Sequence, residues 1–287
     1  MKPEHRFPAD FPPRFASAWG DDGFGLWADL VIPGDGGAQV AQRLRWIEPG
    51  EFLMGSPADE PERWEDEGPR HPVTLTQGFW LADTACTQAL WQAVTGGNPS
   101  HFKGDETCPV ETVSWNDVQR FLRLLEALAP GCRADLPTEA EWEYACRAGT
   151  VGPFSFGRNI TPEQVNYNGD FPYDGGAKGD YRKRTVPVGS LPPNDWGLYE
   201  MYGNVWELCS DGLREYDEQP QRDPVGREGT GELVHRAVRG GSWDLDARRA
   251  RSAARDGAPP GHANQSLGFR LSLRSTSPGP GTGRSST

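Results

Sequence analysis

Residues 193–208 read PNDWGLYEMYGNVWEL, a stretch that places two glycines and two carboxylates in one short segment. Gly197 and Gly203 permit tight backbone turns, because glycine adopts conformations that other residues avoid. Glu200 and Glu207 lie seven residues apart around those turns. Carboxylates interleaved with backbone carbonyls on a bent loop can surround a hard cation such as calcium. The stretch therefore predicts an irregular, loop-built structure with a candidate cation site.

The composition of the whole chain also predicts an irregular fold. The chain has 287 residues, of which 36 are glycine and 26 are proline, and hydrophobic residues make up 36%. Chain reversals and loops therefore outweigh long regular elements. The 11 tryptophans supply large rings that can fill space between irregular segments. We expect a single α+β domain that is irregular and rich in loops.

Charge and cysteine content argue against several classes of protein. Acidic residues number 41 and basic residues 29, which gives a net charge of −12. Such a chain is a poor general binder of nucleic acid, because phosphate neutralisation needs a positive field. The five cysteines form no CxxC pair, which argues against a zinc cluster or a disulfide framework. No apolar run resembles a signal peptide or a membrane span, so we expect a cytoplasmic protein without a membrane partner. We also expect a monomer.

Capping residues predict three helices. The first runs from about residue 87 to 96, where a glycine ends it. The second begins at the N-cap Ser114 and continues with an apolar stripe. The third begins at a capping box formed by Thr138 and Glu141 and ends at Gly149.

Alternating apolar residues predict strands at 25–32, at 42–56 with a Pro-Gly turn at 49–50, and at 73–83. After residue 150 short strands and long loops are expected. We divide the chain into an N-terminal arm with the first strand (1–43), one domain (44–273) and a disordered tail (274–287).

Six motifs occur in order along the chain: FLMGS (52–56), PVETVSWNDVQRFL (109–122), LPTEAEWEYACRAG (136–149), PNDWGLYEMYGNVWEL (193–208), VRGGSW (238–243) and GFRL (268–271). Together they resemble the formylglycine-generating enzyme, or sulfatase-modifying factor, family. The resemblance covers roughly residues 44–273. It implies the irregular formylglycine-generating-enzyme variant of the C-type lectin fold.

The resemblance also implies structural calcium at two places. The first site would use the side chains of Glu200 and Glu207 and the carbonyls of Gly203 and Val205. The second would use the side chains of Asn166 and Asp180 and the carbonyls of Tyr167 and Arg182. Glu200 departs from the Asn or Asp more usual in the family. Two alternatives remain: Glu207 pairs with an arginine such as Arg239, and the asparagines of the second loop cap their own turns.

The founding activity of the family oxidises a substrate cysteine to formylglycine, using two enzyme cysteines that bind Cu(I). Thiolates are suitable ligands for this soft metal. Both cysteines follow the Gly-Gly-Ser-aromatic corner, and here that place reads GGSWDLDARRARSAARD (240–256), without a cysteine. The five histidines are scattered, and no GxSxG signature is present. We therefore expect no catalytic residues and no copper; the alternative is an enzyme of the same family with altered chemistry.

The same fold occurs in the variable proteins of diversity-generating retroelements, whose segment between the Gly-Gly-Ser-Trp corner and GFRL is diversified and binds varied ligands. This chain resembles that group in lacking the cysteines and in the pattern RGGSW…ARSAAR…LGFRL. The residues between show no helical or strand period, as in loops carried on a rigid scaffold. We predict binding of a protein or other ligand, with a solvated loop lacking a partner as the alternative. The predicted residues are Trp243, Asp244, Leu245, Asp246, Arg249, Asp256, Gly257, Ala258, Gly261, His262, Ala263, Asn264, Gln265 and Ser266.

Arginines are dense in the same region: Arg236, Arg239, Arg248, Arg251, Arg255 and Arg270. We expect most of them to pair with carboxylates of the acidic scaffold, including Asp211 and the glutamates at 139–143. Capture of an anionic ligand is the alternative. Nucleic-acid binding is disfavoured, because the segment lacks interleaved aromatic residues and the chain lacks a basic excess.

Overall fold

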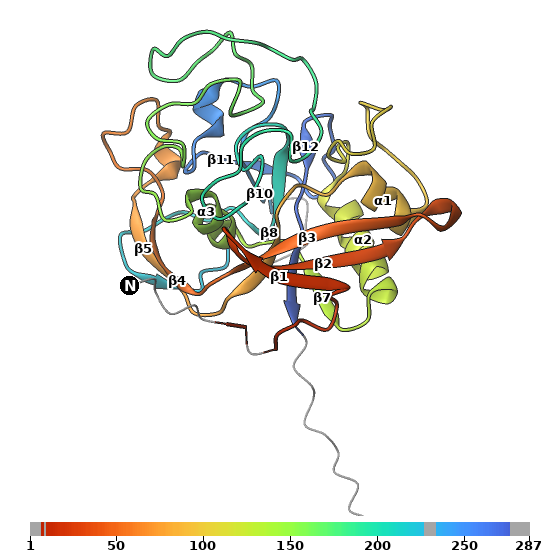
Figure 1. The fold of residues 1–287 in the computed structure, drawn as a ribbon. Coiled ribbons are helices and arrows are strands. Elements are labelled where there is room, and N and C mark those ends of the chain that lie inside the picture. Colours follow the sequence, from red (N-terminus) through yellow and green to blue (C-terminus); the bar gives the residue numbers. More distant parts are fainter. Residues whose placement is uncertain (1–6, 9, 227–233, 276–287) are drawn as a thin grey trace, which may run out of the picture.

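The computed structural model describes residues 7–8, 10–226 and 234–275 (Figure 1). The described chain is an α+β structure, and the long stretch between residues 148 and 205 contains neither a helix nor a named strand. This confirms the predicted irregular, loop-rich architecture. Most of the tail predicted to be disordered (274–287) lies outside the described residues, as do the first six residues of the arm.

A six-stranded sheet joins the beginning and the end of the described chain, in the order β1-β2-β3-β6-β13-β7. Strands β1 and β2, from the predicted arm, pair antiparallel with each other, and β2 pairs with β3. The strands are β1 (Ala18–Asp22), β2 (Gly25–Pro33), β3 (Gln39–Ile47), β6 (Phe79–Ala82), β7 (Cys132–Asp135) and β13 (Ser272–Ser275).

Two smaller sheets complete the fold. One has the order β11-β10-β8-β12, with bounds β8 (Trp206–Gly212), β10 (Arg236–Arg239), β11 (Arg255–Ala258) and β12 (Leu267–Gly268). The other has the order β4-β5-β9, with bounds β4 (Gly50–Met54), β5 (His71–Leu75) and β9 (Gln221–Arg222). The loops after β10 and those after α3 lie at the same end of the molecule (Figure 1), where Asn168 N–H donates to Leu245 O and Ala247 N–H to Phe171 O.

The three predicted helices are confirmed as α1 (Gln88–Thr95), α2 (Trp115–Leu128) and α3 (Glu139–Arg147). Their N-caps are Thr87, Ser114 and Thr138, and the last two form capping boxes with the acidic residue three positions on. Three short 3-10 turns add η1 (Asp35–Gly37), η2 (Glu65–Glu67) and η3 (Ala247–Ala250). Within the described ranges, no helix has the length and apolar character to cross a bilayer.

The strand predicted at 73–83 is wrong, because this segment forms two strands in two sheets. β5 belongs to the three-stranded sheet and β6 to the six-stranded sheet. Between them Thr76 N–H donates to the carboxylate of Asp223 (2.7 Å) instead of to a neighbouring strand. A Cβ at Gly78 would lie 2.3 Å from the Trp46 ring, so the chain passes the ring where only glycine fits.

Four arginines of the C-terminal segment are buried against glutamates. Arg255 forms a bidentate pair with Glu139, with both N···O distances 2.7 Å. Arg239 pairs with Glu143, also of α3. The predicted structural pairing is therefore confirmed for these residues. Asp211 instead accepts the backbone N–H groups of Glu139 and Gly226.

The other two buried arginines bring distant segments together. Arg251 binds Glu60 (2.6 Å) and Glu67, which come from the charged loop before β5. Arg270 binds both carboxylate oxygens of Glu207 at 2.6 and 2.8 Å. Bidentate geometry suits the planar guanidinium and fixes the relative position of the segments it joins.

We predict that Arg251→Met lowers the free energy of unfolding by about 3–5 kcal/mol, because it leaves two buried carboxylates without their cation. Arg274→Met is the control: Arg274 pairs with Glu141, but its side chain is 35% exposed, so the loss should stay within about 1 kcal/mol. Urea denaturation measures both. Equal losses of unfolding free energy would contradict the prediction that the buried ion pairs of Arg251 with Glu60 and Glu67 contribute more than an exposed pair.

Candidate ligand-binding face

The Gly-Gly corner at residues 240–241 sets the start of the predicted binding segment. Both glycines have positive φ, 95° for Gly240 and 73° for Gly241. A Cβ at Gly241 would lie 2.9 Å from the carbonyl oxygen of Arg249. The corner therefore needs glycine for its backbone angles and for its close packing.

Trp243 follows the corner and forms the centre of an aromatic platform. Its backbone N–H donates to Asn204 O (3.1 Å) and its indole N–H to Gln265 O (3.2 Å). The Phe102 ring meets it edge-on at a centroid distance of 5.2 Å, and the Tyr181 ring stacks on it at 6.3 Å. Three segments that are remote in sequence thus meet at one place.

Asp244 lies beside this platform and joins two hydroxyls. Its Oδ1 accepts from Ser242 Oγ (2.7 Å) and from Ser266 Oγ (2.9 Å). No described residue donates to Oδ2, and Asp244 is only half-buried. The negative charge of Asp244 also contributes to a raised pKa of Tyr181, after the larger effect of burial. Asp244 can therefore accept a hydrogen bond from a ligand at the edge of the platform.

The predicted binding residues fall into three classes of exposure. The exposed ones are Asp256, Gly261, His262, Ala263 and Asn264; the half-buried ones are Asp244, Leu245, Asp246, Arg249, Gly257 and Gln265; the buried ones are Trp243, Ala258 and Ser266. Ala258 packs in the main hydrophobic cluster, so the prediction is corrected at this position.

A second group of predicted residues gathers around Trp64 rather than around Trp243. Arg249 pairs with Asp256 at 3.1 Å, and its guanidinium lies 5.1 Å from the Trp64 ring centroid. Arg248 lies closer, at 3.6 Å, and donates to Glu62 O. Asp246 is the N-cap of η3, since its Oδ1 accepts the Arg249 N–H. These contacts hold η3 against the loop before β5.

Sequence reasoning missed the residues that complete the platform, Phe102 and Tyr181. Phe102 is held by its own backbone N–H, which donates to the buried Glu111 (2.8 Å). Lys183 lies over the Tyr181 ring and Arg184 over the Phe102 ring. The signal in the sequence was the basic run YRKR at 181–184 in an acidic chain.

The first predicted calcium set, Glu200 and Glu207 with the Gly203 and Val205 carbonyls, does not fit an ion. Both oxygens of Glu207 bind Arg270, and Oε2 also accepts the indole N–H of Trp142 (2.7 Å). The two oxygens of Glu200 accept the backbone N–H groups of Gly189 and Leu191. All four oxygens already accept hydrogen bonds from protein donors, so a cation would have to compete with these donors for them. The partner of Glu207 is Arg270, not the Arg239 considered from the sequence.

The second predicted set fits better. Asn166 is fully buried; its Nδ2 donates to Arg184 O and to Asn204 Oδ1, while its Oδ1 has no partner in the described chain. The segments that hold Tyr167 and Asp180 lie side by side, because Gly179 N–H donates to Gly169 O (2.9 Å). Arg182 follows on the same strip of chain. Amide, carboxylate and carbonyl oxygens are the ligands that calcium takes.

The five cysteines do not form a reactive centre. All are free and buried, and burial raises the pKa of every thiol, to about 12 for Cys146. A thiolate is the nucleophile and metal ligand, so such thiols are poorly reactive.

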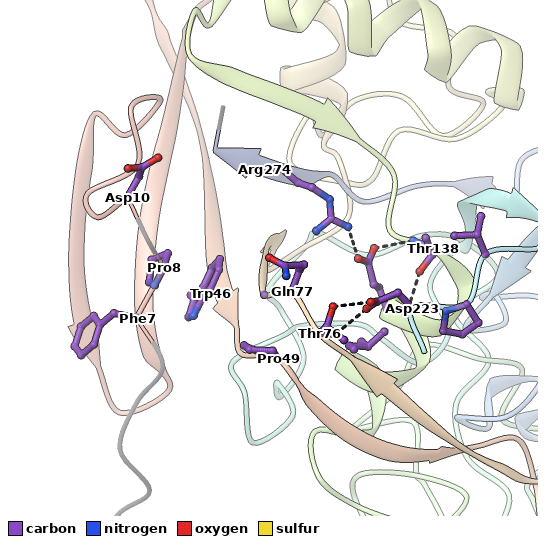
Figure 2. A pocket seen from close by; sticks show the side chains of 15 residues that line it. Phe7, Pro8, Asp10, Trp46, Pro49, Thr76, Gln77, Thr138, Asp223 and Arg274 are labelled. Atoms are coloured by element: carbon purple, nitrogen blue, oxygen red, sulfur yellow. Dashed lines mark hydrogen bonds and ion pairs between the residues drawn. The ribbon is translucent and has the colours of Figure 1, made fainter. Parts of the chain in front are cut away.

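A hollow of about 720 Å³ lies at the N-terminal arm, away from the predicted residues. Figure 2 shows Phe7, Pro8 and Trp46 on one side of it and Thr76, Asp223 and Arg274 on the other. Its polar wall is paired internally: Asp223 accepts from Thr76, and Arg274 donates to Glu141. We assign no ligand to this hollow.

A family model described as a sulfatase-modifying factor enzyme 1-like domain matches residues 36–275. The formylglycine-generating enzyme of Streptomyces coelicolor is 41% identical over 226 residues, covering 73% of this chain and 68% of that enzyme. Among solved structures, Treponema denticola variable protein 1 has a TM-score of 0.70 at 26% identity, covering 86% of this chain and 99% of that one. PvdO from Pseudomonas aeruginosa has a TM-score of 0.68 at 28% identity, covering 90% and 98%.

The chain therefore belongs to the sulfatase-modifying factor family and has its formylglycine-generating-enzyme variant of the C-type lectin fold. This confirms the resemblance seen in the six motifs. The chain spans between 50% and 68% of the length of the first three curated relatives that it matches.

We predict that Gly241→Ala destabilises the protein more than Gly175→Ala does. Both glycines have φ near 70°, so both variants carry about 1–2 kcal/mol of backbone strain. Only Gly241 lacks room for a Cβ, which adds roughly 1–3 kcal/mol of overpacking. Thermal and urea unfolding of the two variants measure the difference. Equal stabilities would contradict the claim that residue 241 has no room for a Cβ.

Proposed function

We propose that this chain is a ligand-binding protein, not a formylglycine-generating enzyme, and that it binds through the loops of residues 244–266. The observation that carries the proposal is the corner itself. At the corner, where the resemblance places the cysteine pair of the family's enzymes, Asp244 bonds Ser242 and Ser266 at the edge of a three-ring platform. Aromatic rings beside a few oriented polar groups are typical of binding sites.

The similarity to Treponema denticola variable protein 1 supports this function. The exposed residues 261–264 lie on a loop whose ends are fixed, since Pro260 O accepts the Asn116 N–H before it and Asn264 O accepts the Thr112 N–H at its end. Such a loop presents side chains from a rigid base. We further propose that the segment is diversified by a retroelement. A second, near-identical copy of the coding segment for 238–271 beside a reverse transcriptase gene would support this; finding neither would refute it.

An enzymatic function is the second candidate, favoured by the 41% identity to the Streptomyces enzyme. The two functions separate in one assay, in which the copper-loaded protein is incubated with a cysteine-containing peptide under oxygen. Formation of an aldehyde, detected by mass spectrometry, would contradict the binding proposal. We expect the thiol to remain unchanged.

We also propose structural calcium at the second predicted set. The unpartnered Asn166 Oδ1 supports it, because a buried polar oxygen without a partner is costly and an ion would satisfy it. Asn166 and Asp180, with the Tyr167 and Arg182 carbonyls, would hold the ion, which would supply a fixed charge that ties the two loop segments together. The first set, at Glu200 and Glu207, is not part of this proposal.

Binding through the loops predicts a specific crosslink. A photoreactive residue placed at exposed His262 should capture a discrete partner in cells, and the combined variant Asp244→Ala, Asn264→Ala should reduce that adduct at least about tenfold. The same residue placed at exposed Arg123 on α2 is the control. Equal adducts from both positions, or an adduct that survives the double variant, would contradict the proposal.

Calcium binding predicts a stabilisation that depends on Asp180. Calcium at one hundred times its Kd should stabilise the protein by about 2.7 kcal/mol, because it binds only the folded state. Asp180→Asn should lose most of this response, whereas Asp174→Asn, exposed in the same loop, should keep it. The melting temperature with calcium and with a chelator measures the effect. An identical response from both variants would refute the site.

A further inference from the structure

A hollow next to the aromatic platform concentrates positive charge in an acidic protein. Its volume is about 590 Å³, and its lining residues are Lys103, Gly104, Asp105, Cys108, Arg182, Arg184, Thr185, Val186 and Pro187. Three basic residues and one acidic residue thus line the hollow, while the chain as a whole carries −12. Three of the chain's four lysines, at positions 103, 178 and 183, belong to the two segments that form this region.

The one carboxylate of the hollow is already engaged. Asp105 accepts the backbone N–H of Thr107 (3.0 Å) and its hydroxyl (2.5 Å), and these bonds lower the pKa of Asp105. No ion pair joins Asp105 to Lys103, Arg182 or Arg184 in the described chain. The three cations are therefore not neutralised by a salt bridge within the hollow.

Contacts with neighbouring segments also position the two arginines of the hollow, Arg182 and Arg184. Arg182 Nη2 donates to Pro162 O (2.7 Å), while its Nη1 is buried without an acceptor in the described chain. The backbone of Arg184 is fixed through its carbonyl, which accepts from the buried Asn166, and its guanidinium lies 5.9 Å from the Phe102 ring centroid. A guanidinium held by its stem and by a ring loses little freedom when it binds an anion.

We propose that this hollow binds the phosphate group of a small organic phosphate ester. Three cations against one engaged carboxylate suit a doubly charged anion, and arginine forks match phosphate oxygens. The volume exceeds what one phosphate needs and lies in the range of small-molecule sites, while Val186 and Pro187 offer an uncharged wall for the organic part. The net charge of −12 disfavours an extended polyanion such as nucleic acid.

The inference rests on the proposed ligand-binding function and names a ligand class for the same face. Phe102 and Tyr181, neighbours in sequence of Lys103 and Arg182, contact Trp243 of the predicted binding segment. A ligand held by its phosphate in the hollow would therefore extend toward the platform and the loops at 244–266.

Titration calorimetry with phenyl phosphate and with inorganic phosphate, at constant ionic strength, tests the proposal. We expect saturable one-to-one binding of both, with phenyl phosphate tighter. Arg184→Gln should weaken binding at least about tenfold, because a charge-assisted hydrogen bond is lost. Arg158→Gln, which changes an exposed arginine outside the hollow, is the matched control.

Three results would overturn the inference: no saturable binding, equal weakening by both variants, or inorganic phosphate binding as tightly as phenyl phosphate. Lys103→Gln provides a second variant from the other wall, and circular dichroism checks that each variant is folded. The crosslink at position 262 does not depend on these residues. Failure of phosphate binding alone would thus leave the proposed ligand-binding function standing, and loss of the crosslink alone would leave the phosphate site standing.

Discussion

Arg239 has no exposed surface, and its guanidinium binds Glu143 of α3 together with the carbonyls of residues 252–254. One side chain thereby ties β10, α3 and the irregular segment after η3. A segment with little regular structure leaves some of its backbone carbonyls without partners in the segment itself. The guanidinium N–H groups of Arg239, which belongs to β10, donate hydrogen bonds to these carbonyls. The charge is tolerated in the interior because Glu143 neutralises it and because its main-chain acceptors are correctly placed.

The same arrangement explains why acidic residues lie where a solvated loop would be expected. The stretch before β5 has the charged composition of a surface loop, yet Glu60 and Glu67 are buried because both bind Arg251. The high acid content of the chain is thus partly structural. It supplies the interior counterions for arginines that follow 63 to 191 residues later in the sequence.

Local signals in the sequence predicted local structure well. Thr87, Ser114 and Thr138 each cap the helix that follows, because a cap acts within one turn. The family motifs predicted the fold, and the arginine-rich segment predicted structural pairing.

The prediction of one strand at 73–83 was wrong because the contact that separates its two halves, between Gly78 and Trp46, is tertiary. Phe102 and Tyr181 were missed for a similar reason: only folding brings them to Trp243. At Glu207 the carboxylate indicated a positively charged partner. Whether that partner is a metal ion or an arginine depends on which group lies beside it in the folded chain, and that group is Arg270.

The buried arginines that bind glutamates recur along the C-terminal segment at 239, 251, 255 and 270, and the exposed residues 261–264 lie between the last two. The anchors act through guanidiniums, glutamates and main-chain carbonyls, and the side chains of His262 and Ala263 take part in none of these ion pairs. The residues that anchor the segment and the exposed His262 and Ala263 are therefore different positions of one sequence. Substitutions at these two positions leave every one of those ion pairs in place, and exposed positions of this kind usually change stability by less than about 0.5 kcal/mol.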